Sequence, residues 1–379
     1  MGQTLSEPIV DKKSHSDSNS KYIYGVSCMQ GWRLTMEDAH ATILKLDDTE
    51  ASFFGVYDGH GGSTVAEYTG DVLHQKVRES PFFDKKDYRS ALKDAFLTID
   101  KDLKEDQNFA YDPSGCTAVT VLLTPENKVF VANAGDSRSV MSIDGHSKAL
   151  SYDHKPVDRL ESQRIVAAGG FVEFGRVNGN LALSRAIGDF EFKQNDHLPA
   201  EEQVVTCNPD IMEHQLTNGD EFIVLACDGI WDCMTNQEVV DYIRARVADK
   251  QPLEEICEQI MDHCLAPDSE VGGVGCDNMS IVIVGLLQGR SKEEWYEWMA
   301  SRVPKVVKQD ALGNDLEPTK INEQPMNDII EPSVDEKISL TSSDTGPVPA
   351  DPIAAAAAAV TATTATTATT DVKNDCTDL

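Results

Sequence analysis

Basic residues are scarce in this chain of 379 residues, in which 33 lysines and arginines face 64 aspartates and glutamates. The formal net charge of −31 would repel a polyanion, so nucleic acid is not an expected partner. No apolar run reaches the roughly 18 residues of a membrane-spanning helix. Since 40% of the residues are hydrophobic, enough apolar material remains for a substantial core. We expect a soluble globular protein, whose acidic surface by itself selects no function.

Several motifs of catalysis and metal binding are also missing. None of the nine cysteines belongs to a C-x-x-C pair, which argues against a zinc ribbon. None is followed by arginine at the C-x₅-R spacing of cysteine-dependent phosphatases, and no G-x₄-G-K-[ST] loop of a P-loop NTPase is present. The odd number of cysteines and the lack of a signal peptide favour a reducing compartment. We expect the protein in the cytoplasm and nucleus, in part at membranes.

The two ends of the chain differ in composition from its middle. Residues 1–21 are polar and are predicted to form a flexible arm. Gly2 followed by Ser6 fits the N-myristoylation pattern, although a chance match is as good an explanation. One myristoyl chain would give only transient membrane contact. Residues 304–379 contain no aromatic residue and end in a Thr/Ala repeat, so we predict a disordered tail there.

Residues 22–303 are predicted to form one folded catalytic domain. Runs of β-branched and aromatic residues predict strands at 22–28, 41–46, 52–57, 116–124, 128–135, 139–143, 221–227 and 278–287. Apolar stripes of helical period predict helices at 63–78, 87–106, 158–167, 235–248, 252–265 and 292–302. Strands come in groups rather than alternating with helices, which favours an α+β sandwich over a doubly wound parallel sheet. The glycine-containing segment 171–190 is interpreted as a mobile flap.

Acidic residues lie next to three of the predicted strands. Asp58 follows SFFGVY, Asp228 follows EFIVLAC and Asp277 precedes NMSIVIV. A carboxylate at the end of a buried strand is desolvated unless it is paired or metal-bound. If these residues converge on one rim of the sandwich, their charges require cations. All-oxygen ligands suit Mg²⁺ or Mn²⁺, although any single Asp-Gly pair is more often a simple β-turn.

These motifs resemble the protein phosphatase 2C family over about residues 22–300. The matching strings, in the family's order, are RLTMEDAH, FFGVYDGHGG, SGCTAV, ANAGDSR, LALSRAIGD, ACDGIWDCM and DNMSIVIV. The start M-G-Q-T-L-S and the acidic tail resemble the fungal branch. The resemblance implies a central antiparallel β-sandwich flanked by α-helices, with a dimetal centre at one end. It also implies that the chain is a metal-dependent protein serine/threonine phosphatase.

The resemblance further implies which residues bind two Mg²⁺ or Mn²⁺ ions. Asp58 would bridge both ions. The side chain of Glu37 and the backbone carbonyl of Gly59 would serve one of them. Asp228 and Asp277 would serve the other. Two such ions lower the pKa of a water and neutralise phosphoryl oxygens, so hydrolysis would proceed without a phosphoenzyme.

Other matching positions complete the implied site. Asp38 would act mainly through metal-bound waters, and Asp136 would support a third, weaker metal site together with Asp228. Arg33 matches the phosphate-binding arginine, whose planar fork suits two phosphate oxygens. His60 matches the proposed general acid, which protonates the leaving serine or threonine oxygen.

The sequence gives less information about the surface of this protein that would contact the substrate. Arg185 and Asp189, in the segment 155–190, are candidates for substrate contact, while packing and turn structure is the alternative interpretation. We expect a monomer that acts on phosphorylated proteins; the resemblance implies protein kinases, including stress-activated ones, as targets. Two other functions remain open: a phosphatase-like binding module without catalysis, and another two-metal hydrolase such as a nucleotide phosphodiesterase.

Overall fold

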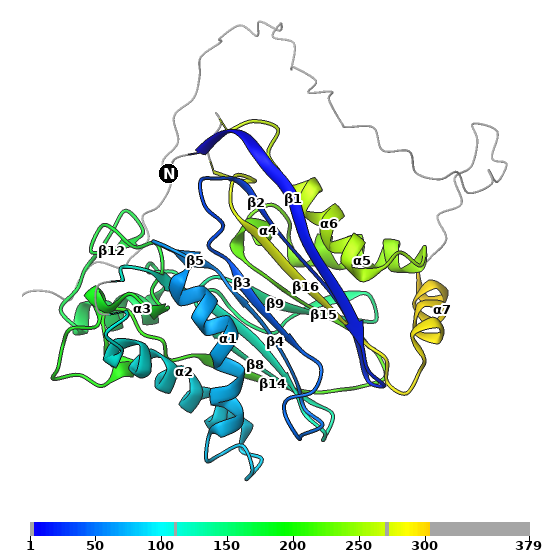
Figure 1. Cartoon of the computed structure of the whole chain (residues 1–379), viewed down its shortest axis with the longest axis horizontal. Coiled ribbons are helices and arrows are strands. Elements are labelled where there is room, and N and C mark those ends of the chain that lie inside the picture. Colours follow the sequence, from blue (N-terminus) through cyan, green and yellow to red (C-terminus); the bar gives the residue numbers. More distant parts are fainter. Residues whose placement is uncertain (1–3, 110–111, 270–272, 304–379) are drawn as a thin grey trace, which may run out of the picture. The chain divides into compact units, whose positions relative to one another are not determined.

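The computed structural model of this chain describes residues 4–109, 112–269 and 273–303. Gly2 and the predicted tail 304–379 lie outside the described residues. Within the described part, no helix combines the length and the apolar character that crossing a bilayer requires. The elements form an α+β fold in which two antiparallel sheets lie between two layers of helices (Figure 1).

Two sheets of antiparallel strands build the centre of the fold. The first sheet has the strand order β1 (Thr4–Ser18), β2 (Tyr22–Arg33), β16 (Met279–Leu286), β15 (Asp220–Ala226), β9 (Arg138–Ile143) and β10 (His146–Ala149). The second has the order β14 (Asp210–Gln215), β8 (Lys128–Ala134), β7 (Ala118–Leu123), β4 (Ser52–Tyr57) and β3 (Ala39–Ile43). Two smaller sheets pair β11 (Val172–Glu173) with β12 (Arg176–Val177), and β13 (Ile187–Gly188) with β6 (Gly115–Cys116) and β5 (Gly59–His60).

The two large sheets enclose an apolar core between them. Tyr24 of β2 meets Phe54 of β4 edge-on across this core, with 5.6 Å between the ring centroids. Strands β4, β15 and β16 are buried on both faces. They therefore read in the sequence as continuous apolar runs rather than as alternating patterns. Each fully buried Leu, Ile, Val or Phe side chain stabilises the fold by about 1.5–3 kcal/mol.

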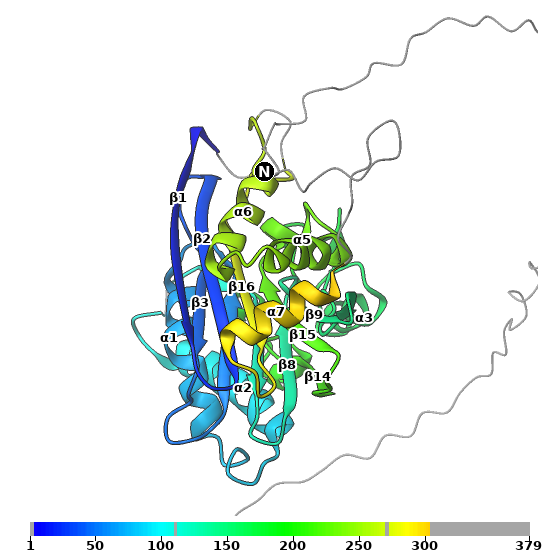
Figure 2. The same cartoon turned by 90° about the vertical axis from the view of Figure 1, so that its right-hand side faces the viewer.

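Helices cover the outer face of each sheet. The second sheet packs against α1 (Thr64–Glu79) and α2 (Tyr88–Glu105). The first packs against α4 (Asp228–Trp231), α5 (Asn236–Ala248), α6 (Leu253–Cys264) and α7 (Lys292–Arg302). Figures 1 and 2 show these two groups of helices on opposite sides of the sheets. The remaining elements are α3 (Arg159–Ala167) and the 3₁₀ helices η1 (Phe190–Phe192) and η2 (Ala200–Glu202).

The prediction of a flexible arm over residues 1–21 is wrong for residues 4–18, which form β1. This strand pairs antiparallel with β2 and runs alongside it in both views (Figures 1 and 2). Lys12 Nζ donates a hydrogen bond to Oδ1 of Asp262 in α6 at 2.6 Å, and the Ser14 hydroxyl donates to the carboxylate of Glu258 in α6. The side chains are polar and mostly exposed, so the backbone ladder and these α6 contacts hold the strand instead of apolar burial.

Strands β10 and β14 were also not predicted. Like β1, each is the last strand at one edge of its sheet. Most of their side chains are exposed or half-buried, so their sequences lack the apolar signal of the central strands. The segment 171–190, interpreted as a flap, contains the β11–β12 pair and β13.

Candidate active site

Acidic residues from separate parts of the chain meet at one end of the sandwich. Asp58 directly follows β4 and Asp136 follows β8, both in the second sheet. Asp228 begins α4 directly after β15, and Asp277 lies just before β16, both next to the first sheet. Because β15 and β16 are antiparallel neighbours, the end of one and the start of the other lie at the same rim.

Asp58 is common to two compact groups of possible metal ligands. In the first, Asp58, Asp136 and Asp228 place carboxylate oxygens within 4.8 Å of one another. In the second, ligand atoms of Asp38, Asp58 and Cys227 lie within the same distance. Asp58 therefore belongs to both groups, whereas Glu37, Gly59 and Asp277, which the resemblance also implies as ligands, belong to neither.

Burial and mutual repulsion raise the pKa values of the Asp38, Asp58 and Asp228 carboxyl groups. Burial is the largest cause for Asp58 and Asp228; the charge of Asp228 adds to the rise at Asp58, and that of Asp136 to the rise at Asp228. Burial, followed by the charge of Asp277, raises the pKa of Asp38 to about 7. Both carboxylate oxygens of Asp38 are buried, and hydrogen bonding from Ser280 and Cys227 does not offset the effect of burial on its pKa. Buried carboxylates of this kind are expected where a cation completes the site.

Two basic side chains lie against the acidic cluster. A guanidinium nitrogen of Arg33 lies 2.5 Å from Oδ2 of Asp277, and the Arg33 side chain is 42% exposed. Lys155 Nζ lies 2.5 Å from Oδ2 of Asp136. Burial lowers the pKa of Lys155, but the charge of Asp136 outweighs it and the pKa is raised. Lys155 was not among the predicted site residues, because no motif marks a lysine 19 positions from its acidic partner.

Glu37 and Gly59 lie beside the cluster in close backbone contact. The Glu37 carboxylate accepts from the Thr35 hydroxyl at 2.7 Å and from the Gly62 amide at 3.2 Å. The Glu37 amide donates to Asn278, next to Asp277, at 2.9 Å. A Cβ atom at Gly59 would lie 2.2 Å from the backbone oxygen of Glu37. Only glycine therefore lets these two segments approach so closely.

The donor set fits hard divalent cations. Apart from one sulfur, every candidate ligand atom in the two groups is a carboxylate oxygen, and oxygen ligands suit Mg²⁺ and Mn²⁺. The exception is Cys227, whose Sγ accepts from the Ser280 amide at 3.2 Å and lies 3.5 Å from the Asn278 carbonyl. Burial raises the pKa of the Cys227 thiol well above its usual value, so the sulfur stays neutral. A neutral thiol is a poor ligand for such ions.

His60 forms a close pair with Asp189. The small sheet aligns Gly59–His60 with Gly115–Cys116, and the latter with Ile187–Gly188. His60 Nε2 lies 2.8 Å from Oδ2 of Asp189, whose side chain is 5% exposed. Burial lowers the pKa of His60, but the hydrogen bond and charge of Asp189 outweigh it, so the pKa is raised. A Cβ at Gly115 would lie 2.5 Å from that carboxylate, so glycine there leaves room for the pair.

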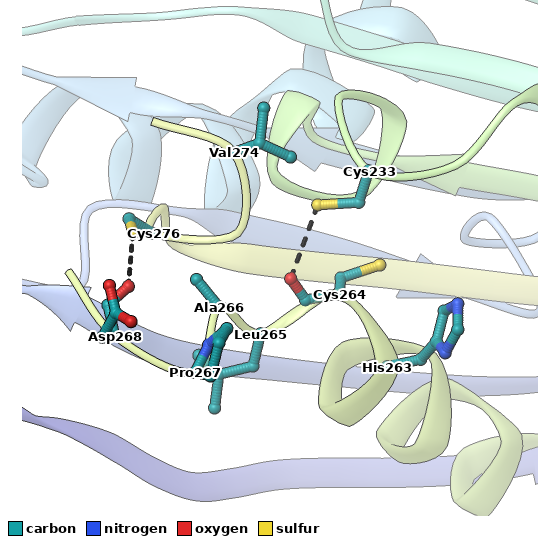
Figure 3. A pocket seen from close by; sticks show the side chains of 9 residues that line it. All are labelled: Cys233, His263, Cys264, Leu265, Ala266, Pro267, Asp268, Val274 and Cys276. Atoms are coloured by element: carbon teal, nitrogen blue, oxygen red, sulfur yellow. Dashed lines mark hydrogen bonds between the residues drawn. The ribbon is translucent and has the colours of Figure 1, made fainter. Parts of the chain in front are cut away.

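A cavity of about 580 Å³ lies outside the acidic cluster, on the side of α4 and α6. Its lining residues include Cys233, Cys264 and Cys276 (Figure 3). None of the predicted catalytic residues lines it. The cavity is therefore distinct from the position at which the carboxylates converge.

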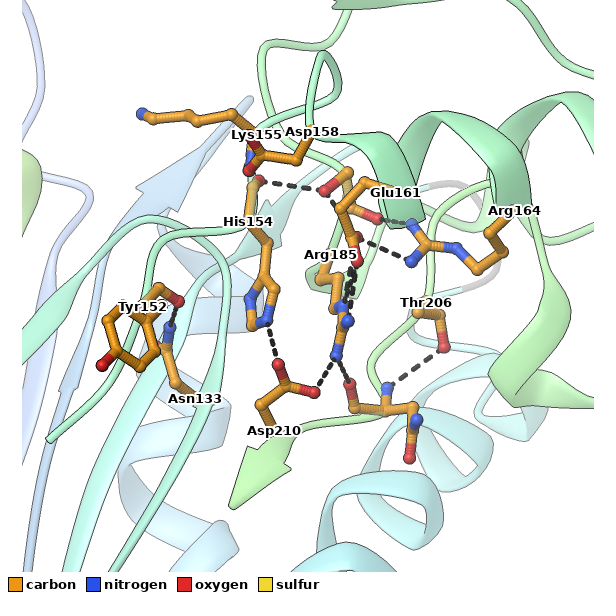
Figure 4. A network of polar contacts seen from close by, with 12 residues as sticks. Asn133, Tyr152, His154, Lys155, Asp158, Glu161, Arg164, Arg185, Thr206 and Asp210 are labelled. Carbon is orange, nitrogen blue, oxygen red and sulfur yellow. Dashed lines mark hydrogen bonds and ion pairs between the residues drawn. The ribbon is translucent and has the colours of Figure 1, made fainter. Parts of the chain in front are cut away.

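Arg185 lies in a buried network of protein acceptors, which favours packing, the alternative interpretation, over substrate contact. Its guanidinium lies 2.7 Å from Glu161 and 2.8 Å from Asp210, and also donates to the Asn208 carbonyl at 3.1 Å. Figure 4 shows it between these partners, with Arg164 on the other side of Glu161. The Arg185 side chain is only 12% exposed. Its N–H donors are directed to protein acceptors, and it connects α3, through Glu161, to the start of β14, through Asp210.

The comparisons with known proteins agree with this geometry. Residues 22–271 match the family described as Protein phosphatase 2C. A "Protein phosphatase 2C homolog 2" from the fungus Hypocrea jecorina is 55% identical over 312 residues, which are 80% of this chain and 71% of that protein. A protein of the same name from Schizosaccharomyces pombe is 51% identical over 308 residues, 80% of this chain and 83% of the relative.

Solved structures show the same fold. The crystal structure of a phosphatase from a pathogenic strain of Toxoplasma gondii aligns with a TM-score of 0.64 at 26% identity, covering 73% of this chain and 96% of that one. The predicted α+β sandwich and the predicted family, fungal relatives included, are thus confirmed. This chain belongs to the protein phosphatase 2C family and is a metal-dependent serine/threonine protein phosphatase.

Proposed function

We propose that the cluster around Asp58 is the catalytic centre, where phosphoserine and phosphothreonine of protein substrates are hydrolysed directly by water. The observation that carries this proposal is the convergence of Asp58, Asp136 and Asp228, whose carboxylate oxygens lie within 4.8 Å of one another. The burial of both Asp38 oxygens supports it, because a buried carboxylate needs a counter-charge.

The residues that would hold Mg²⁺ or Mn²⁺ are those implied by the resemblance: Glu37, Asp38, Asp58, Gly59, Asp136, Asp228 and Asp277. We assign two ions to the centre and a third, weaker one to Asp136 and Asp228. When bound, these ions supply a water of lowered pKa and neutralise charge on the phosphoryl oxygens. Lys155 balances part of the charge of Asp136 and thereby weakens the third position.

Arg33 binds the phosphate group of the substrate. Its exposed guanidinium is anchored at one nitrogen by Asp277 and presents further N–H donors to solvent. A planar fork of donors fixes two phosphate oxygens and so orients the phosphorus atom for attack.

His60 protonates the leaving oxygen, and Asp189 positions it. With Nε2 bonded to Asp189, the Nδ1 proton of the imidazolium is the one available to the serine or threonine oxygen. The negative charge of Asp189 stabilises the protonated ring and thus keeps the acid ready near neutral pH.

The proposed cellular role rests on the family resemblance and on the composition of the chain. We propose that the substrates are phosphorylated proteins, including stress-activated protein kinases, and that the chain works as a monomer in the cytoplasm and nucleus. Gly2, within M-G-Q-T-L-S, is the proposed myristoylation site for transient membrane contact. The net charge of −31 supports protein rather than nucleic-acid substrates.

The variants Asp58→Asn and Asp228→Asn test the proposal. Each keeps the side-chain shape but removes a carboxylate, so Mn²⁺ affinity by calorimetry and turnover of a phosphothreonine peptide should both fall, while the circular dichroism spectrum persists. Asp71→Asn on the exposed side of α1 is the matched control and should change neither. Full activity in Asp58→Asn would refute the site. Faster cleavage of a dinucleotide than of the peptide would instead favour a phosphodiesterase.

A further inference from the structure

Two thiols lie next to each other at the cavity beside α4 and α6. The Sγ atom of Cys233 lies 3.6 Å from the backbone oxygen of Cys264 and 3.3 Å from that of Gly229. The two side chains also shift each other's pKa, and both line the same cavity. Figure 3 shows the Cys233 side chain pointing from its turn toward the end of α6, which carries Cys264. The fold thus pairs two thiols that are 31 positions apart in the chain.

Metal binding does not account for this pair. Among the described residues, the groups of three or more possible metal ligands include neither Cys233 nor Cys264. Two adjacent thiols have a second chemistry, which is oxidation to a disulfide. Both cysteines are free thiols in this structure.

The surroundings give the two thiols different reactivities. The hydrogen bond from Cys264 lowers the pKa of Cys233, against the effect of burial, whereas the same bond and burial raise the pKa of Cys264. Cys233 is half-buried and lines a cavity whose wall includes Val274, which is 64% exposed. Both cysteines line the cavity, and a small oxidant reaches the half-buried Cys233 more readily than Cys264, which is 6% exposed.

We propose that Cys233 and Cys264 form a peroxide-sensitive dithiol whose disulfide weakens metal binding at the acidic cluster. The Cys233 thiol loses its proton, and the thiolate attacks one oxygen of hydrogen peroxide; this forms a sulfenic acid and a hydroxide, which takes up that proton to give water. The Cys264 thiol then attacks that sulfur, which forms the S–S bond and releases a second water. Two thiols and one peroxide thus yield one disulfide and two waters, and the two thiols supply both electrons.

The disulfide is coupled to the cluster through α4. Once Cys233 is in a disulfide it has no S–H proton, so the Gly229 carbonyl loses the donor that now lies 3.3 Å away. Gly229 follows Asp228, and the Asp232 amide closes the same turn by donating to the Asp228 carbonyl at 2.8 Å. An S–S bond of about 2.0 Å also requires Cys233 to move toward α6. This second half of the proposal rests on the proposed role of Asp228.

Peptide mapping under non-reducing conditions tests the first half without any activity assay. The full chain is treated with hydrogen peroxide in Mg²⁺ buffer, alkylated and digested. A linked peptide joining Cys233 to Cys264 is expected in the wild type and in Cys28→Ser, which removes another half-buried thiol. It should be absent from Cys233→Ser. Absence of that peptide from the wild type, or linkage of Cys233 to a different cysteine, overturns the proposal.

Calorimetry with Mn²⁺ on oxidised and reduced protein tests the second half. Oxidation should weaken Mn²⁺ binding about ten-fold in the wild type, as loss of a contact behind a ligand typically does, and dithiothreitol should restore it. Cys233→Ser should bind Mn²⁺ equally before and after peroxide. Equal affinity in oxidised and reduced wild type refutes the coupling to α4. If the affinity falls but the reduced protein has no phosphopeptide activity, the dithiol stands and the proposed function fails.

Discussion

Glu161 is the centre of a buried charge network, and its replacement by glutamine has a predictable cost. Its carboxylate, 4% exposed, lies 2.6 Å from Arg164 and 2.7 Å from Arg185. Glu161→Gln preserves the shape but leaves both buried guanidinium groups without this counter-charge. Removing one partner of a buried ion pair costs about 3–5 kcal/mol, so the free energy of unfolding should fall by about that amount in urea denaturation followed by circular dichroism.

The same substitution should lose its effect in acid. Burial raises the pKa of Glu161, but the hydrogen bond from Arg185 and the charge of Arg164 outweigh it and lower the pKa from 4.5 to about 2. A lowered folded-state pKa gives stability that is complete above pH 4.5 and is lost as the pH falls toward 2. The difference in unfolding free energy between wild type and Glu161→Gln should therefore shrink over this range.

An exposed pair provides the control. Lys101 and Glu105 lie 3.8 Å apart on α2 with side chains more than 60% exposed, so Glu105→Gln should change stability by about 1 kcal/mol or less. Arg185→Met, like Glu161→Gln, should destabilise the fold, and it should leave the KM of the folded enzyme unchanged. A stable Glu161→Gln, together with a raised KM in a stable Arg185→Met, would refute this account and restore Arg185 as a substrate contact.

Three further predictions concern the active site and the sheet edge. Asp189→Asn should lower the pKa of His60, shift the alkaline limb of the kcat profile to lower pH and reduce kcat about 10-fold to 100-fold; an unshifted profile would contradict the positioning role. Gly59→Ala places a Cβ 2.2 Å from the Glu37 backbone oxygen. Thermal melting should show a loss of about 1–3 kcal/mol in stability, and titration should show weaker Mn²⁺ binding. Unchanged Mn²⁺ binding would show that Glu37 can shift freely. Deleting residues 2–18 exposes the edge of β2, so light scattering should reveal aggregation, and a monodisperse product would speak against a structural role for β1.

Much of the fold was predictable because its central elements carry strong local signals. The bounds predicted for β4, β15 and β16 agree with the structure within two residues, since each is a continuous apolar run. Helix α2 was likewise predicted, and Asp87 caps it by accepting from the Ser90 amide. Strand β1 was missed because a polar edge strand is held by its neighbour's backbone, which leaves no hydrophobic pattern in its own sequence.

The sequence pointed to carboxylates that the fold brings together, and less so to their supporting contacts. Asp58 and Asp228 follow apolar strands, and a carboxylate at the end of a buried strand is a candidate metal ligand that the sequence itself reveals. The partner of His60 is 129 positions away, and Lys155 reaches Asp136 only through the fold. Asp189 was a candidate for substrate contact, whereas the pairing of β5, β6 and β13 places it against His60.

Anomalous diffraction from crystals soaked in Mn²⁺ tests the central claim most directly, because it locates the ions without reference to activity. We predict two strong peaks, both within coordination distance of Asp58, with Asp228 on one side of the pair. Peaks remote from Asp58, or a single strong site that Asp58 does not touch, would contradict the account.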